Sequence, residues 1–172
     1  HKDIRTVMLM QDTLFESSKT IWDNVLRLDN PVVNAVKEYE EFLENGMDDA
    51  ARLSSLMARL DDLNAWSFES DLKQILGKLN IHHLNEKMGN LSGGQKKRVA
   101  LAQSLIEADL YQGNCLLIMD EPTNHLDIES VQWLEDFLKT GAKAVIVISH
   151  DKTFVDNLTN RTIEVTMGRI YD

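Results

Sequence analysis

The feature that most constrains the fold is a pair of short apolar runs, each followed directly by chemically active side chains. Residues 115–119 are all apolar and lead into Asp120 and Glu121. Residues 144–148 are apolar and mostly β-branched, and His150 follows one residue later. Between them, residues 128–139 repeat apolar side chains at helical spacing. Strands that alternate with helices predict an α/β fold with a mostly parallel sheet and right-handed crossovers.

The first half of the chain is expected to be mainly helical. Asn30 and Pro31 mark one helix start, because proline suits the first helical position, and Gly46 marks its end. A second helix follows so closely that the two should form an αα-hairpin. The elements expected here are a strand at residues 5–10, helices from residue 31 and from residues 48–49, and a helix at residues 67–79.

The second half should bury most of its apolar side chains. The strand at residues 144–149 is continuously apolar, as a strand buried on both faces would be. The other expected elements are helices at residues 92–108, 128–139 and 152–158, and strands at residues 115–119, 162–166 and 169–171. In the helix at residues 128–139, the side chains expected to point toward the core are those of Ile128, Val131, Leu134, Phe137 and Leu138.

Composition narrows the class of protein. A chain of 172 residues suits one domain with a real core. The net charge of -10 argues against a broad phosphate-binding surface, although Lys96, Lys97 and Arg98 form a local basic cluster whose plainer interpretation is a solvated helix face. The single cysteine, Cys115, excludes an internal disulfide and fits a reducing compartment. No apolar run is long enough to cross a bilayer, and no secretory signal is visible.

The sequence Ser92, Gly93, Gly94, Gln95 opens a helix and has two interpretations. Two glycines allow a ligand to approach the backbone closely, and a helix N-terminus offers free amides and a partial positive charge to a phosphate. The plainer interpretation is a capping box between the serine and the glutamine.

Asp120 and Glu121 lie at the carboxyl end of a strand, where α/β sheets place ligand chemistry. Adjacent residues on a strand end point to different sides, so the two carboxylates can serve different purposes. A solvated acidic turn before Pro122 is the alternative. Asp127 suits the N-cap of the following helix. A lone His150 after a strand is often just a surface residue, and a single Gln11 is weak evidence by itself.

Taken together and in order, the motifs resemble those of an ABC-type ATPase. Residues 91–95 are similar to its signature motif, residues 116–127 to its Walker B and D-loop, and residues 149–151 to its switch-histidine segment. The run Asn124, His125, Leu126, Asp127 resembles the ABC-F family in particular. The likeness extends from Gln11 to Tyr171, with a longer stretch at residues 107–114 that lacks the common proline.

The resemblance implies a role for each motif residue, with ATP and Mg²⁺ as cofactors. Asp120 would hold Mg²⁺, Glu121 would be the general base, and His150 would contact the γ-phosphate. Gln11 would contact the metal and sense the γ-phosphate. Ser92, Gly93, Gly94, Gln95 and Asp127 would serve a nucleotide shared with a second ATPase domain of the parent protein.

One expected element is missing from the sequence. The phosphate loop G-x-x-x-x-G-K-[ST] occurs nowhere in it. The chain is therefore expected to be a partial ABC ATPase domain, a P-loop NTPase core with an inserted helical arm, cut from the N-terminal half of a longer protein. Its expected parts are a Q-loop strand at residues 1–12, a helical subdomain and arm at residues 13–90, and the signature, Walker B, D-loop and switch-histidine core at residues 91–172.

The missing loop has two expected consequences for the chain in isolation. ATP binding should be weaker than about millimolar, and ATP hydrolysis absent, because that loop normally supplies most phosphate contacts. The strand at residues 144–149 should keep an unpaired apolar edge, so the chain should rearrange, self-associate or be marginally stable.

ABC-F membership implies a cytoplasmic parent ATPase that couples ATP binding and hydrolysis to the ribosome, in translation or antibiotic resistance, without a stable membrane subunit. Two alternatives stay open: the ATP-binding subunit of a membrane ABC transporter, and a non-catalytic module whose helical arm binds a partner.

Overall fold

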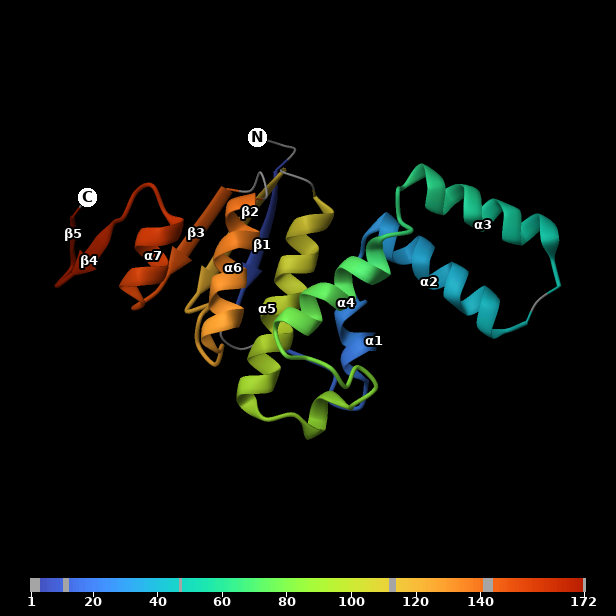
Figure 1. The fold of residues 1–172 in the computed structure, drawn as a ribbon, viewed down its shortest axis with the longest axis horizontal. Helices are drawn as coiled ribbons and strands as arrows, with labels where there is room; N and C mark the ends of the chain where they lie inside the picture. The colour runs from blue at the N-terminus through green and yellow to red at the C-terminus, as the bar shows by residue number, and fades with distance from the viewer. Residues whose placement is uncertain (1–3, 11–12, 47, 112–113, 141–143, 172) are drawn as a thin grey trace.

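The computed structural model describes all residues except 1–3, 11–12, 47, 112–113, 141–143 and 172. Figure 1 shows a small sheet with helices beside it, a helical hairpin that extends away at one end, and a two-stranded hairpin at the other. No helix among the described residues is both long and apolar enough to cross a membrane.

The central sheet is parallel, as predicted. Its order is β1 (Arg5–Leu9), β2 (Cys115–Asp120), β3 (Ala144–Ile148). Val7 pairs with Leu117, which pairs with Val145, so three strands from distant parts of the chain share one register. Because their carboxyl ends meet at one edge, the residues after β2 and β3 come together.

The two faces of the sheet differ. Val7, Leu117 and Met119 are buried on the face that packs against α5 (Gly93–Leu110). On the other face Ile146 is 50% exposed and Ile148 57% exposed. The expectation that residues 144–149 are buried on both faces is therefore wrong. β3 is one of the two edge strands of the described sheet, and no described element covers that face.

The helices of the second half follow the prediction closely. The longer stretch at residues 107–114 is helical at its start, because α5 continues to Leu110. In α6 (Ile128–Thr140) Leu134 and Leu138 are buried, but Ile128 is 77% exposed, so its predicted inward position is wrong. Ile128 is the first residue of α6 and lies beyond the end of the core. The last helix is α7 (Lys152–Leu158).

The helical hairpin is formed by α2 (Pro31–Glu44) and α3 (Ala50–Asp62). Each helix starts at a local cap: the side chain of Asn30 accepts a hydrogen bond from Val32 N at 2.8 Å, and that of Asp49 accepts one from Arg52 N at 3.0 Å. Gly46, with φ of 58°, follows the first helix in the left-handed conformation that glycine tolerates. The predicted hairpin is confirmed, and α4 (Phe68–Lys78) follows it.

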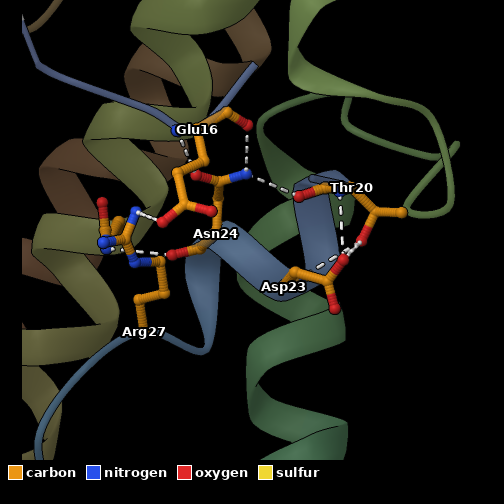
Figure 2. Close-up of polar contacts among 6 residues, drawn as sticks. Glu16, Thr20, Asp23, Asn24 and Arg27 are labelled. Atoms are coloured by element: carbon orange, nitrogen blue, oxygen red, sulfur yellow. Dashed lines mark hydrogen bonds and ion pairs between the residues drawn. The ribbon is translucent and has the colours of Figure 1, made fainter. Parts of the chain in front are cut away.

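A short helix after the first strand was not expected. α1 (Ile21–Val25) begins with a capping box in which Asp23 and Thr20 bond to each other's backbone amides. Figure 2 shows Asn24, which is 1% exposed, beside it: its side chain donates to the carbonyls of Thr20 and Glu16 and accepts from the Glu16 amide. Gln103 of α5 donates to the Asn24 carbonyl at 3.2 Å, so this network anchors the chain after β1 to α5.

Two short elements complete the structure. The 3₁₀ helix η1 (Met88–Asn90) precedes the signature residues. β4 (Glu164–Thr166) and β5 (Arg169–Tyr171) form an antiparallel hairpin whose turn residues, Met167 and Gly168, both have positive φ, as a two-residue type I′ turn requires. β4 is shorter than the predicted strand at residues 162–166, and β5 matches the predicted strand at residues 169–171.

Candidate active site

Glu121 and His150 meet at the carboxyl edge of the sheet. The Glu121 carboxylate accepts a hydrogen bond from the His150 amide at 3.1 Å, and the Ser149 hydroxyl donates to its other oxygen at 3.4 Å. His150 Nε2 lies 3.5 Å from Glu121 Oε1. The Glu121 side chain is 18% exposed and the imidazole is fully exposed. The parallel register of β2 and β3 therefore holds a carboxylate still and places an imidazole beside it, open to solvent.

The backbone at Glu121 is unusual. Its φ is 49°, in the left-handed region that side chains rarely adopt, and its amide donates to the Ile148 carbonyl at 2.7 Å. Such conformations persist where surrounding contacts determine them, and they cluster at functional sites. The left-handed turn directs the chain away from β2 immediately after Asp120.

A pocket of about 290 Å³ opens at the same edge. Asp120 and Glu121 line one part of it, and Lys97 and Arg98 of α5 line another. Among the described residues no three acidic, histidine or cysteine side chains group closely enough to hold a metal. The donors fit Mg²⁺ all the same, since this ion keeps several waters and takes one or two carboxylates together with phosphate oxygens.

The local basic cluster is only partly a solvated face. Lys97 is exposed, which fits that interpretation. Arg98 does not fit it, because it is partly buried and its Nε atom is enclosed without a hydrogen-bond partner among the described residues. The sequence did not predict that Arg98 would line the same pocket as Asp120 and Glu121. Helical spacing alone does not show which way the guanidinium faces.

The signature residues form the predicted capping box. Ser92 Oγ accepts from the Gln95 amide at 3.3 Å, and Gln95 Oε1 accepts from the Ser92 amide at 2.8 Å. These two side chains are therefore bonded to each other's backbone. The glycines begin the helix, whose first turn presents amides without intrahelical partners. The phosphate-binding role of these residues stays a prediction.

The signature and the loop after β2 are in close contact. A Cβ atom added at Gly94 would lie 3.3 Å from the ring of His125, which itself has a φ of 66°. The nearby ring therefore gives a packing reason for glycine at this position. The sequence contained the two motifs but did not show that they touch.

Asp127 caps α6, as expected. Its Oδ1 accepts from the Ser130 amide at 2.8 Å, and its Oδ2 accepts from the Asn80 side chain at 2.6 Å. The pKa of the Asp127 carboxyl is held below its ordinary value, chiefly by the hydrogen bond from the Ser130 backbone. Asn80 was missed in the sequence because it lies 47 residues away, at the end of another helix.

Gln11, the remaining predicted site residue, lies outside the described residues. The structure thus brings Asp120, Glu121 and His150 to one edge, and the signature against His125 in the loop after β2. Paired carboxylates at the carboxyl edge of a parallel sheet lie where α/β proteins place ligand chemistry.

Comparison with known proteins identifies the class. The family model described as "ABC transporter" matches residues 1–124, and the chain belongs to this family of ATP-binding domains. Domains of this family generally bind ATP and Mg²⁺.

Relatives extend over nearly the whole chain. It is 37% identical to the "Uncharacterized ABC transporter ATP-binding protein YfmR" of Bacillus subtilis, over 98% of this chain and 27% of that protein. It is 34% identical to the "Energy-dependent translational throttle protein EttA" of Mycobacterium tuberculosis, over 95% and 29%. It is 32% identical to "ATP-binding protein Uup" of Haemophilus influenzae, over 98% and 26%. The chain spans about a quarter of the length of these relatives.

Solved structures agree on the fold. The ATP-binding subunit of an ABC transporter superposes with a TM-score of 0.55 at 17% identity, covering 90% of this chain and 52% of that one. A structure titled "RNase-L Inhibitor" superposes with a TM-score of 0.54 at 20% identity, covering 96% and 26%. The predicted α/β fold of an ABC ATPase is confirmed.

Proposed function

We propose that this chain is part of an ATPase domain of the ABC-F type, in a protein that couples ATP binding and hydrolysis to work on the ribosome. The observation that carries the ATPase part is the Glu121 carboxylate held beside His150 at the ends of two parallel strands. The ribosomal part is supported by the run from Asn124 to Asp127, by the α2–α3 hairpin, and by the similarity to a protein named as a translational throttle.

In this proposal the residues at the sheet edge act on the terminal phosphate. Glu121 orients and polarises the attacking water, and its hydrogen bonds from Ser149 and the His150 amide keep the carboxylate in place. His150 contacts the γ-phosphate, as its exposed ring allows. Asp120 and Gln11 hold Mg²⁺, which when bound offsets the negative charge that develops on the phosphates.

The signature residues serve a second nucleotide in the same proposal. The amides of Gly93 and Gly94 at the start of α5 face the γ-phosphate of ATP held by a second ATPase domain. Ser92 and Gln95 stabilise the first turn of that helix through their capping box. Asp127, at the start of α6, bridges the two domains near the attacking water. The second domain is thus a required partner.

The chain is proposed to be one segment of a longer protein that also supplies the phosphate loop. Its match to about a quarter of each relative supports this. The 172 residues by themselves should then bind ATP more weakly than about millimolar and turn it over at no measurable rate.

A second candidate is the ATP-binding subunit of a membrane transporter. The family description and the name of the Bacillus subtilis relative favour it. The two candidates differ in what the protein binds while ATP is held: a ribosome, or a membrane subunit.

The test uses the full-length protein with Glu121→Gln, which removes the base and keeps the shape of the side chain. ATP turnover should fall by about 10²–10⁴-fold, the usual contribution of a positioned base. The ATP-bound variant should then sediment with ribosomes, in the presence of ATP and not of ADP. Glu129→Gln, a change of the same kind at an exposed position of α6, is the matched control and should behave as wild type.

Two results would contradict the proposal. Unchanged turnover in Glu121→Gln would remove the assigned role of the carboxylate. Loss of turnover without ribosome sedimentation, together with co-purification of a membrane subunit, would favour the transporter instead.

A further inference from the structure

The end of α4 and the start of α6 are joined by two hydrogen bonds that the proposed function does not use. The Asn80 side chain donates to Asp127 Oδ2 at 2.6 Å, and the Ser130 hydroxyl donates to the Lys78 carbonyl at 2.8 Å. Ser130 is only 3% exposed, so its hydroxyl bond is enclosed by protein. We call these two contacts the α4–α6 clamp. It joins residues that are 47 and 52 positions apart.

Asn80 is suited to this position by its backbone. Its φ is 56°, and its amide donates to the Gly77 carbonyl at 3.0 Å, immediately after α4. A residue in this left-handed conformation often ends a helix. Glycine adopts the conformation most easily, and asparagine adopts it more easily than most residues that carry a side chain. Asparagine therefore ends the helix as glycine would, and in addition supplies an amide donor. That donor reaches Asp127.

The clamp occupies the oxygen of Asp127 that its own helix leaves open. Ser130 N bonds to Oδ1 at 2.8 Å, which is an ordinary helix cap, and Asn80 bonds to Oδ2. With both oxygens bonded, the carboxylate cannot turn about its own axis without losing a charge-assisted hydrogen bond. The orientation of Asp127 thus depends on α4 as well as on α6.

The hairpin is connected to the same helix. Trp66, which lies just before α4, donates through its ring nitrogen to Asp61 of α3 at 2.5 Å. Its ring also meets Tyr39 of α2 edge to face, with 5.5 Å between ring centroids. Contacts therefore join both helices of the hairpin to Trp66, and the chain continues from Trp66 through α4 to Asn80, which bonds to Asp127.

We propose that Asn80 is a positioning residue, which orients Asp127 and couples the helical hairpin to the ATPase site. The inference rests on the proposed function, in which Asp127 acts where the two ATPase domains meet. Movement of the hairpin when its partner binds would then change the orientation of Asp127, and ATP turnover with it. The Asn80–Asp127 bond is the exposed part of the clamp, so it can be broken and remade more readily than the enclosed Ser130 bond.

The test uses two variants of the full-length protein. Asn80→Gly removes the amide and keeps the left-handed backbone, because glycine adopts it without strain. Asn80→Asp keeps the shape and places a second carboxylate against Asp127. Asn64 provides the matched control: its φ is 49°, it follows α3, it is exposed, and its side chain has no hydrogen-bond partner among the described residues. The same two substitutions are made at Asn64.

Asn80→Gly should lower kcat about three- to tenfold and leave KM for ATP within about twofold, the size expected from one exposed hydrogen bond to a charge. Asn80→Asp should lower kcat further at pH 8. Its deficit should shrink as the pH falls toward about 5, because two adjacent carboxylates then share a proton and bond again. A purely structural role would lower Tm and leave the pH profile of kcat unchanged. Both Asn64 variants should match wild type.

The outcomes separate the two claims. If the wild type hydrolyses ATP, Glu121→Gln does not, and the Asn80 variants match the Asn64 controls, the clamp is overturned and the proposed function stands. If the wild type and Glu121→Gln turn over ATP equally, or neither does, the proposed function falls and this inference falls with it.

Discussion

The sheet and the α2–α3 hairpin are stabilised in different ways. In the sheet, Val7 pairs with Leu117 across more than half of the chain, and Leu117 and Met119 have no exposed surface, nor has Leu134 of the adjoining helix α6. In the hairpin, neighbouring helices begin at their own caps and carry surface ion pairs such as Arg59 with Glu38 at 2.7 Å. The strands of the sheet therefore pair over long sequence separations. The two helices of the hairpin are neighbours in the chain, and they combine local caps and an ion pair with buried side chains such as Phe42 and Leu56.

This difference has a functional consequence. A change in the sheet core alters the spacing of the strand ends that hold Glu121 and His150. A change on the outer hairpin leaves those strand ends in place, and one route from the hairpin to the site runs through α4 and the clamp. Substitutions in the two regions should therefore differ in what they disturb as well as in size, and three predictions test the comparison.

The largest effect is expected in the sheet region. Leu134→Ala should lower the free energy of unfolding by about 2–5 kcal/mol, because the lost side chain is fully buried and leaves a cavity. Leu43→Ala, at a leucine 53% exposed on the hairpin, should cost less than about 1 kcal/mol. Urea unfolding of the full-length variants measures both. Equal losses at the two positions would break the comparison.

A smaller effect is expected from the hairpin ion pair. Arg59→Met keeps much of the side-chain length and removes the contact with Glu38, whose side chain is 47% exposed. The loss should be about 0–1 kcal/mol and should diminish further in high salt, as for other exposed pairs. Thermal unfolding at two salt concentrations provides the measurement. A loss above about 2 kcal/mol would show that the hairpin is more than a locally stabilised element.

The smallest effect concerns the cap on α6. The folded pKa of Asp127 is lowered, so its contribution to stability is fully present above the ordinary aspartate pKa of about 3.9 and is lost as the pH falls through the lower folded value. Asp127→Asn should therefore flatten the stability profile at acid pH and leave its shape near pH 7 unchanged. Unfolding measured from pH 2 to pH 7 tests the sign. A profile that steepens instead would contradict the lowered pKa.

Much of the fold followed from local patterns. The starts at Asn30, Asp49 and Ser92 were visible because a cap bonds to an amide two or three residues away. The strands expected at residues 162–166 and 169–171 left two residues between them, and these form the turn at Met167 and Gly168. α1 was missed, although Thr20 and Asp23 stand at capping-box spacing, because its five residues are too short to show a periodic pattern. Two predictions of burial were wrong, at Ile128 and in β3. Helical spacing and a continuous apolar run show which side chains are apolar, but they do not show what covers them.

The candidate site was predicted in composition but not in geometry. The order of the motifs indicated that Glu121 and His150 belong together, and the parallel register places their side chains 3.5 Å apart. The roles of these residues remain predictions, and Gln11 lies outside the described residues. Asn80 could not have been found, since nothing near it in sequence distinguishes it from Asn64, another left-handed asparagine after a helix.

The sequence by itself determined the helix caps, the turns, the strand–helix alternation and the motif residues, because each depends on groups within a few positions of one another. Only the tertiary structure decided the left-handed turn at Glu121, the contact of Gly94 with His125, and the bond from Asn80 to Asp127. These features require segments tens of residues apart to pack at one edge of the sheet. Their geometry depends on how crossovers and register combine, which no local pattern encodes.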